Sequence, residues 1–457
     1  MYDVIVIGGG SGGYAASIRA SQLGAKVALV EAAETGGTCV NRGCIPTKVW
    51  LRAAGFLRSI KTADEFGIDA SVKKLDLNTI VDRKSGVSGD IRMGMEGLLQ
   101  NNGVEVIRGR AVLKSSQEIN VEGTALETKK IIIATGSSLA DADIPGLDKA
   151  AMTTDQVLEM VESPSSILIW GTAGPIEVEM AVLLNAFGCK VYLSTEEPRL
   201  LAKEDHDTSQ RIAQAFREQG VEILPRLALK SVKKSKQGYT CTLSGSKERT
   251  VEVEKVLVSS RKPNTADIGM EEVGVKLDEN GRIQVNEKLE TSVEGIFAIG
   301  DATGGWMLSH ASSSMAVTAA ENAIGKTKPF PFHLIPRGIW TYPEVGAVGL
   351  SEEEAEKKGI DIEIGDFPYS INGLAMCRNE ISGNVKIVSD AKYGEILGVH
   401  IVGNHATDLV GEAVMAMQLE ATTKELANSI RVHPTFSETI VDSARDAENW
   451  ALYLPKR

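Results

Sequence analysis

The N-terminal segment constrains the fold of this chain more than any other stretch of sequence. It has the sequence YDVIVIGGGSGGYAASIRASQLGAKVALVE and runs from Tyr2 to Glu31. The uninterrupted apolar run VIVI predicts a strand that is covered on both faces, as in a parallel sheet. Small and apolar residues at helical spacing follow over residues 12–23, and VALV predicts a second strand. The segment therefore predicts a βαβ unit with a glycine-rich turn after its first strand.

The turn contains the pattern GxGxxG, formed by Gly8, Gly10 and Gly13, and Glu31 ends the next predicted strand. These glycines permit a tight turn, close approach of the backbone to a pyrophosphate, and close packing of helix on strand. The helix N-terminus offers the positive end of its dipole, and a glutamate can accept a hydrogen bond from a ribose hydroxyl. The segment indicates a site for an adenosine dinucleotide. FAD, NAD and other adenosine cofactors all remain open on this motif alone.

A second βαβ unit is predicted about 160 residues later. It comprises a strand from Ser166 with the sequence ILIW, a helix over Val178–Phe187, and the strand KVYL. A buried strand, IIIATGS, lies between the two units, and GIFAIGD precedes a predicted small-residue helix over Ser312–Ile324. Prolines 329, 331 and 336 mark a linker, after which strands and helices alternate. We predict an α/β fold with four regions, at residues 1–148, 149–265, 266–335 and 336–457.

Composition narrows the possible partners and compartment. The chain has 457 residues, which exceeds what one core usually holds, and a formal net charge of −12. A net acidic surface repels phosphate backbones and anionic lipid, so nucleic acid and membrane are excluded as expected partners. The sequence offers no membrane-spanning apolar run and no room for a signal peptide before its first strand, so we expect a cytoplasmic protein. Five cysteines are too few for a secreted disulfide framework.

Two of the cysteines, Cys39 and Cys44, lie close together in GGTCVNRGCIPTK. Residues five apart in a regular helix have Cα atoms about 8.7 Å apart, which is beyond the reach of a disulfide. The pair can bridge only if the helix is interrupted, and Gly43 provides that freedom. Pro46 fits the start of a helix, whose dipole would lower the pKa of a nearby thiol. A redox pair is favoured over a metal site, which lacks further Cys or His ligands nearby, and over two unrelated thiols.

Near the C-terminus, HPTFSE places His433 five residues before Glu438. A thiol with an ordinary pKa is mostly protonated at neutral pH, so dithiol chemistry needs a proton acceptor that titrates near pH 7. Imidazole meets this need, and a carboxylate can orient the ring. The alternative is structural, with His433 and Pro434 forming a helix cap and the first residue of that helix.

Together these motifs resemble the flavoprotein disulfide reductases, the pyridine nucleotide-disulfide oxidoreductase family. GxGxxG, the two-cysteine element, ATGS (134–137) and AIGDATG (298–304) occur in the order found in that family, over nearly the whole chain. NRGCIPTK, LGVHIVG and HPTFSE look most like the dihydrolipoamide dehydrogenase branch. The C-terminal sequence WALYLPKR lacks the vicinal cysteines of mercuric reductases.

The resemblance implies an FAD-binding domain (1–148), an NAD-binding-like domain (149–265), a return to the FAD domain (266–335) and an interface domain (336–457). It implies a homodimer in which His433 and Glu438 act on the redox pair of the other subunit. It also implies that Cys39 exchanges with the substrate, that Cys44 stacks on the flavin, and that Lys48 pairs with Glu179 beside the flavin. The implied FAD-binding residues are Gly8, Gly10, Gly13, Glu31, Lys48, Ala111, Ser137, Asp301 and His310.

The second βαβ unit departs from this pattern. When it is anchored on EVEMA, its three glycine positions hold Thr172, Gly174 and Glu177, unless Gly171 acts as a shifted first glycine with one extra loop residue. Thr195 stands where the ribose-binding acid is expected, and VSSRKPN is short by a glycine. A glutamate at the third position obstructs close packing and places negative charge near a pyrophosphate. We therefore predict weak nicotinamide binding at Gly174 and Thr195.

Three functions follow as hypotheses. The first is an enzyme that oxidises dihydrolipoyl groups on a carrier protein, or a small dithiol, and passes electrons through Cys39–Cys44 and FAD to NAD. The second is an electron-transfer flavoprotein subunit with the same dithiol half and a protein or quinone acceptor. The third is a non-catalytic member of a lipoyl-protein complex, against which the intact cysteines and the His433–Glu438 pair argue.

Overall fold

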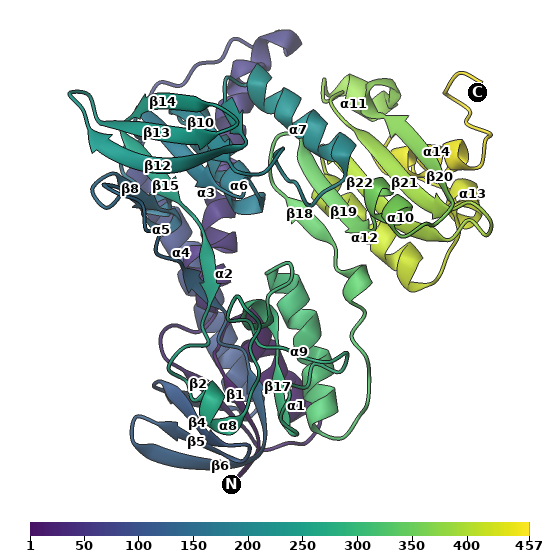
Figure 1. The fold of residues 1–457 in the computed structure, drawn as a ribbon. Helices are drawn as coiled ribbons and strands as arrows, with labels where there is room; N and C mark the ends of the chain where they lie inside the picture. Colours follow the sequence, from purple (N-terminus) through teal and green to yellow (C-terminus); the bar gives the residue numbers. More distant parts are fainter. Residues whose placement is uncertain (457) are drawn as a thin grey trace. The chain divides into compact units, whose positions relative to one another are not determined.

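The computed structural model describes residues 1–456 and contains two compact units (Figure 1). The first unit is made of residues 1–142, 153–162 and 259–330. The second is made of residues 143–152 and 163–258 together with the chain from Pro331 onward. Each unit is thus assembled from segments far apart in the sequence.

The first unit is built on a seven-stranded sheet with the order β3-β2-β1-β6-β5-β4, to which β17 adds by pairing with β6. The strands β3, β2, β1, β6 and β17 are parallel, whereas β6, β5 and β4 form an antiparallel extension. A separate two-stranded ribbon joins β16 to β7. The strands are β1 (Tyr2–Ile7), β2 (Val27–Glu31), β3 (Glu105–Arg108), β4 (Ala111–Ser115), β5 (Glu118–Val121), β6 (Thr124–Ile133), β7 (Ser137–Leu139), β16 (Arg261–Pro263) and β17 (Ile296–Ala298).

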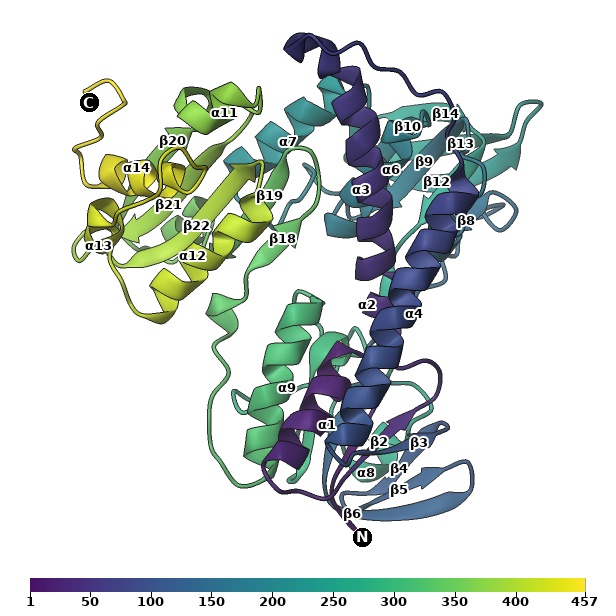
Figure 2. The same cartoon turned by 180° about the vertical axis from the view of Figure 1, so that it is seen from behind.

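The helices of this unit include a closely packed pair, α1 and α9, that lie side by side in both views (Figures 1 and 2). Their buried positions are rich in small residues, among them Ala16 and Ala20 of α1 and Ala316 and Ala320 of α9. Small side chains let two helix backbones approach closely, which holds the glycine turn against the start of α9. The helices are α1 (Ser11–Gln22), α2 (Gly37–Arg42), α3 (Cys44–Lys61), η1 (Ala63–Phe66), α4 (Leu77–Asn101), α5 (Thr154–Leu158), α8 (Met270–Val273), η2 (Gly300–Thr303) and α9 (Ser309–Ala323).

The second unit contains a five-stranded sheet with the order β11-β10-β9-β15-β8, in which β11, β10, β9 and β15 are parallel. A three-stranded antiparallel sheet, β12-β13-β14, adjoins it in the chain. Strand β9 has the buried apolar centre Ile167–Ile169, and β10 is buried from Val191 to Thr195, as the sequence predicts for a sheet covered on both faces. The elements are β8 (Ala151–Thr153), β9 (Ser166–Gly171), α6 (Pro175–Ala186), β10 (Lys190–Thr195), α7 (His206–Glu218), β11 (Glu222–Pro225), β12 (Leu227–Lys234), β13 (Tyr239–Gly245), β14 (Glu248–Val253) and β15 (Lys255–Val258).

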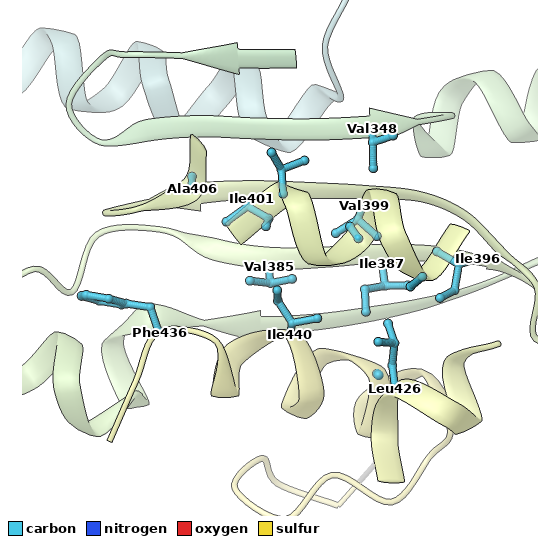
Figure 3. Packing of buried hydrophobic residues seen from close by; sticks show 14 of the residues in the cluster. Val348, Val385, Ile387, Ile396, Val399, Ile401, Ala406, Leu426, Phe436 and Ile440 are labelled. Carbon is cyan, nitrogen blue, oxygen red and sulfur yellow. The ribbon is translucent and has the colours of Figure 1, made fainter. Parts of the chain in front are cut away.

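The C-terminal part of the second unit is an antiparallel sheet, β18-β19-β22-β21-β20, with helices packed on it. Its apolar core joins Val385 and Ile401 of the sheet to Leu426, Phe436 and Ile440 of the C-terminal segment (Figure 3). This packing fixes the backbone just before α14. The elements are η3 (Phe332–Leu334), β18 (Arg337–Ile339), β19 (Glu344–Gly349), α10 (Glu352–Lys357), β20 (Ile362–Pro368), η4 (Tyr369–Ile371), α11 (Gly373–Cys377), β21 (Asn384–Asp390), β22 (Ile396–Gly403), α12 (Ala406–Gln418), α13 (Thr423–Asn428) and α14 (Glu438–Ala447).

The predicted fold class is confirmed, with two Rossmann-like sheets and a C-terminal α+β sheet. Two predicted helix starts are wrong. The helix expected at Val178 begins at Pro175, because proline is well tolerated at the first helical position, where its missing N–H is not needed. The helix expected at Ser312 begins at Ser309. In residues 1–456, no helix combines the length and the apolar character that a membrane crossing requires.

Candidate redox and dinucleotide sites

The first glycine turn, between β1 and α1, has two positions, Gly8 and Gly13, at which a side chain does not fit. Gly8 has a φ of +100°, and a Cβ there would lie 2.4 Å from the carbonyl oxygen of Ala134. A Cβ on Gly13 would lie 1.7 Å from the carbonyl oxygen of Gly8. Both glycines are therefore required by the close approach of the turn to β6 and of α1 to β1. Gly10, the second glycine of the motif, is the N-cap of α1.

Glu31 closes this turn from the end of β2. One carboxyl oxygen accepts a hydrogen bond from the backbone N–H of Gly9 at 2.5 Å, and the other accepts from that of Ala33 at 2.7 Å. The side chain is thus held at the mouth of the turn, beside the N-terminus of α1. This is the place from which a carboxylate can reach the ribose of a dinucleotide whose phosphates lie at the helix end.

The residues around the turn fit FAD. A second glycine pair, Gly36 and Gly37, approaches it, and Gly36 forms a backbone bridge with Gly10. A Cβ on Gly37 would lie 2.8 Å from the Cα of Gly10, so the two backbone segments can approach this closely only because Gly37 lacks a side chain. The hydroxyl of Thr135, next to the Gly8 contact, is buried without a hydrogen-bond partner. A cradle of bare backbone with an orphaned hydroxyl matches a site for a bound phosphate-bearing group.

Asp301 lies in η2 and belongs to a side-chain network that joins the two segments predicted to hold the flavin. Its carboxylate accepts a hydrogen bond from the Ser137 hydroxyl at 2.6 Å. Arg261 donates to the same hydroxyl at 2.8 Å and to the Ser137 carbonyl at 2.6 Å. Arg261 was not among the predicted site residues. Its place in VSSRKPN, directly after the buried strand β15, was the available signal.

The predicted interruption between the two cysteines is present. Helix α2 ends at Arg42, Gly43 has the non-helical angles φ −137° and ψ −109°, and α3 begins at Cys44. The side chain of Cys39 is hydrogen-bonded to that of Cys44. The two cysteines are therefore neighbours in the structure, and their disulfide stays a prediction. In residues 1–456, no group of three or more Cys, His, Asp or Glu side chains is arranged to hold a metal ion.

Several neighbouring groups lower the pKa of the Cys39 thiol. The hydrogen bond from Cys44 is the main cause that lowers the pKa of Cys39 from its ordinary value near 9 to about 6, against the opposing effect of burial. The hydroxyls of Ser309 and Ser11, and the charge of Lys48, lower it further. The two serine hydroxyls are also hydrogen-bonded to each other at 2.6 Å. They were missed by the sequence reasoning, because only the tertiary packing of α1 on α9 brings them to the cysteine.

Three further predicted residues of the first unit occupy defined places. Lys48 lies one turn into α3, close enough to act on Cys39 by its charge. His310 is the second residue of α9 and is exposed. Ala111 begins β4 with its methyl group buried in the apolar core, so a ligand would meet its backbone rather than its side chain. Their roles toward FAD stay predictions.

His433 and Glu438 form the predicted dyad geometry within the second unit. Nδ1 of His433 is 2.9 Å from one carboxyl oxygen of Glu438, and the other oxygen accepts from the Thr435 backbone N–H at 2.9 Å. The His433 side chain is 76% exposed, so its second nitrogen faces outward. Helix α14 begins at Glu438, so the alternative in which His433 caps a helix that starts at Pro434 is wrong.

Glu179 and the predicted nicotinamide residues also belong to the second unit. The Glu179 carboxylate accepts a hydrogen bond from the Trp340 backbone N–H at 3.1 Å. Lys48, its predicted partner, belongs to the first unit, and the pairing stays a prediction. Gly174 is the N-cap of α6, and Thr195 ends β10.

Two family models cover most of the chain. The pyridine nucleotide-disulphide oxidoreductase model matches residues 2–316, and the dimerisation-domain model of the same family matches residues 335–444. The chain belongs to the pyridine nucleotide-disulphide oxidoreductase family. It is an FAD-dependent oxidoreductase similar to dihydrolipoyl dehydrogenases, and its dimerisation domain supports a homodimer.

Relatives match along their full lengths. Dihydrolipoyl dehydrogenase of Thermus scotoductus is 37% identical over 100% of this chain and 99% of its own length. That of Bacillus subtilis is also 37% identical, over 99% of both chains. Among solved structures, LpdA from Mycobacterium tuberculosis has a TM-score of 0.89 at 25% identity, over 97% of this chain and 99% of its own. The HOCl-induced flavoprotein disulfide reductase RclA from Escherichia coli has a TM-score of 0.84 at 26% identity, over 96% and 99%.

Proposed function

We propose that this flavoprotein disulfide reductase oxidises a dithiol of the dihydrolipoyl type through Cys39 and Cys44. The observation that carries the proposal is the hydrogen-bonded pair of thiols at the break between α2 and α3, with the pKa of Cys39 lowered to about 6. A thiol with this pKa is a thiolate at neutral pH, and a low pKa also makes a sulfur a good leaving group in disulfide exchange. The likeness to dihydrolipoyl dehydrogenases over the whole chain supports the choice of substrate class.

The exchange begins with Cys39 and Cys44 joined in a disulfide. A substrate thiolate attacks the sulfur of Cys39, a bond forms between these two sulfurs, and Cys44 leaves as a thiolate. The second substrate thiolate then attacks the first substrate sulfur, which closes the substrate disulfide and releases Cys39. The substrate loses two electrons and two protons, and the cysteine pair gains the two electrons.

His433 serves as the acceptor for the substrate protons. Its ring is oriented by Glu438 through Nδ1, which leaves Nε2 exposed to take a proton from an incoming thiol. We propose that the dyad of one subunit acts on the cysteine pair of its partner in a homodimer, a proposal that rests on the family's dimerisation domain. The remaining chemistry belongs to FAD, which when bound would accept the electron pair from the reduced cysteines.

For FAD we propose the cradle formed by the Gly8 and Gly36 turns at the N-terminus of α1, with Glu31 on the ribose side. Asp301 and Ser137 would hold the remainder of the cofactor, since their network joins η2 to β7.

The carrier of the dihydrolipoyl group and the cytoplasmic location stay proposals. The family binds FAD and NAD(P).

The test is anaerobic titration of the FAD-loaded enzyme with dihydrolipoamide, followed by absorbance. Two electrons should give a long-wavelength absorption band that Cys44→Ser abolishes. Cys39→Ser has no disulfide to reduce and should show the band before any dithiol is added. Cys377→Ser, at an exposed cysteine outside the site, is the matched control and should leave the titration unchanged. If dihydrolipoamide did not change the absorbance of the bound FAD, the proposed substrate class would be rejected.

A second candidate is a reductase that acts on another disulfide, as the similarity to RclA suggests. The same titration separates the two, because that candidate would leave dihydrolipoamide unreactive while another dithiol of similar potential reduces the flavin.

A further inference from the structure

The second dinucleotide-type turn, between β9 and α6, differs from the first in length. In the first sheet Ile7 pairs with Val30, which brings Gly8 level with Glu31. In the second sheet Gly171 pairs with Thr195. Gly171 is therefore the counterpart of Gly8, and Thr195 that of Glu31. Three residues, Gly8–Gly10, lead to the N-cap of α1, whereas four, Gly171–Gly174, lead to that of α6.

The side chain of Glu177 fills the space under this longer turn. It occupies the position of Gly13, three residues after the N-cap. A Cβ on Gly171 would lie 2.7 Å from one Glu177 carboxyl oxygen, and a Cβ on Gly174 would lie 3.4 Å from the other. Glu177 as a whole is only 5% exposed. The two remaining glycines of the turn thus make room for the chain's own carboxyl group.

The loop is also fixed in a conformation of its own. Ala173 has a φ of +50°, and its carbonyl oxygen accepts a hydrogen bond from the Leu201 N–H at 2.9 Å. Pro175, the first residue of α6, has no N–H to offer a bound anion. At α1 the equivalent position is Ser11, whose backbone N–H is present. The end of α6 therefore lacks one of the donors that an anion site at a helix N-terminus uses.

Thr195, the counterpart of Glu31, offers no acceptor to a ribose. Thr195 is fully buried, and its hydroxyl accepts a hydrogen bond from the Glu197 N–H at 3.1 Å. The exposed residues that follow, Glu196 and Glu197, are acidic and would repel the 2′-phosphate of NADP.

We infer that this turn does not accept the pyrophosphate of NAD(H) or NADP(H), because the Glu177 carboxyl group lies within the turn at the N-terminus of α6, the end of a Rossmann helix at which phosphates bind. The residues present do not fit the nicotinamide cofactor that the family binds. The inference rests on the proposed function, since it concerns the electron-accepting side of the same enzyme.

The experiment measures NADH and NADPH binding to the FAD-loaded enzyme by calorimetry, beside flavin reduction by dihydrolipoamide. We expect fast reduction by the dithiol and dissociation constants for both nucleotides above about 1 mM. A micromolar constant for either nucleotide would overturn the inference. Failure of the dithiol to reduce the flavin would instead overturn the proposed function and leave the binding result valid.

Variants at Glu177 distinguish the effect of the side chain's size on NADH binding from the effect of its charge. Glu177→Gly combined with Thr195→Glu should tighten NADH binding by at least about tenfold, since a charged hydrogen bond to the ribose alone is worth roughly 10–150-fold. Glu177→Gln keeps the size of the side chain and should gain less than Glu177→Gly. Equal gains for Gln and Gly, or a folded double variant with no gain, would contradict the assignment. The unaltered protein supplies the decisive measurement if the double variant does not fold.

Discussion

The glycine turn after β1 and the turn after β9 join the same kinds of element. Each follows a buried parallel strand, and each leads into a helix of 12 residues whose N-cap is a glycine in extended conformation. They differ at the third residue after the cap, where Gly13 has no room for a Cβ and Glu177 buries a carboxyl group. The βαβ scaffold therefore survives with or without a dinucleotide site, and the site depends on a few residues set upon it.

The position of the carboxyl group also distinguishes the two turns. In the first, Glu31 projects from the end of β2 and holds the Gly9 N–H from outside the turn. In the second, Thr195 replaces that acid, and the carboxyl group of Glu177 lies inside the turn instead. The carboxylate of Glu31, at the end of β2, can accept a hydrogen bond from a ribose hydroxyl. The carboxyl group of Glu177, within the second turn, opposes the binding of phosphates there. The comparison can be tested from both directions.

Gly13→Glu, which copies Glu177 into the first turn, should have the largest effect on FAD binding. Its Cβ would lie 1.7 Å from the Gly8 carbonyl oxygen, so α1 must move and the phosphate cradle must open. FAD affinity should fall at least about a hundredfold, measured as the ratio of flavin to protein absorbance after dialysis. Gly55→Ala is the control, since a Cβ there meets no atom within 4 Å. Full FAD content in Gly13→Glu would remove the physical basis of the comparison.

His433→Gln tests the dithiol reaction separately from the turn after β9. Loss of a general base should slow dihydrolipoamide oxidation at pH 7 by about 10²–10⁴-fold, with FAD content unchanged. Glu438→Gln should cost less, because the base remains and only its orientation is affected. His333→Gln, at another exposed histidine of the same unit, is the control in stopped-flow measurements. If His433→Gln kept the full rate, the dyad would have no part in the reaction.

Glu31→Thr gives the first turn the residue found at the end of β10. The Gly9 N–H loses its acceptor and the ribose loses a charged partner, so FAD binding should weaken by roughly 10–150-fold. Fluorescence titration of the apoprotein with FAD measures the change. Glu34→Thr, three residues further on at an exposed position, is the matched control. Equal affinities for Glu31→Thr and the unaltered protein would show that the Glu31 carboxylate does not matter.

The smallest expected effect concerns the acidity of Cys39. Because its pKa is lowered to about 6, the thiolate forms as the pH rises through that value, and alkylation by iodoacetamide should level off above about pH 7. Ser309→Ala removes one hydrogen bond and should raise the midpoint by less than about one pH unit. Cys44→Ser changes the hydrogen bond that lowers the pKa of Cys39 most, so it should shift the midpoint further. Mass spectrometry of the alkylated peptide reports the rate at Cys39, and a midpoint near 9 in the unaltered protein would contradict the assignment.

Several features of this protein were determined by its sequence alone. The run VIVI, the GxGxxG spacing and Glu31 specified a βαβ unit with a bare turn, because only glycine fits a turn that touches the neighbouring strand. Gly43 between Cys39 and Cys44 indicated the break in the helix for a similar local reason. The loss of glycine at Glu177 and of the acid at Thr195 was also visible in the sequence, since these residues are defined by their distance from a strand and a helix.

Only the tertiary structure decided how the remaining parts meet. Gly171, and not Thr172, proved to be the counterpart of Gly8, because the register between β9 and β10 fixes it and sequence spacing left two choices. The Glu177 side chain turned inward because two glycines leave space for it there. Ser11 and Ser309 reach Cys39 from helices almost 300 residues apart, through the packing of small residues between α1 and α9. Local sequence patterns predict which residues a turn requires. The partners of a side chain depend on contacts between segments that are distant in the sequence, and local spacing does not predict these contacts.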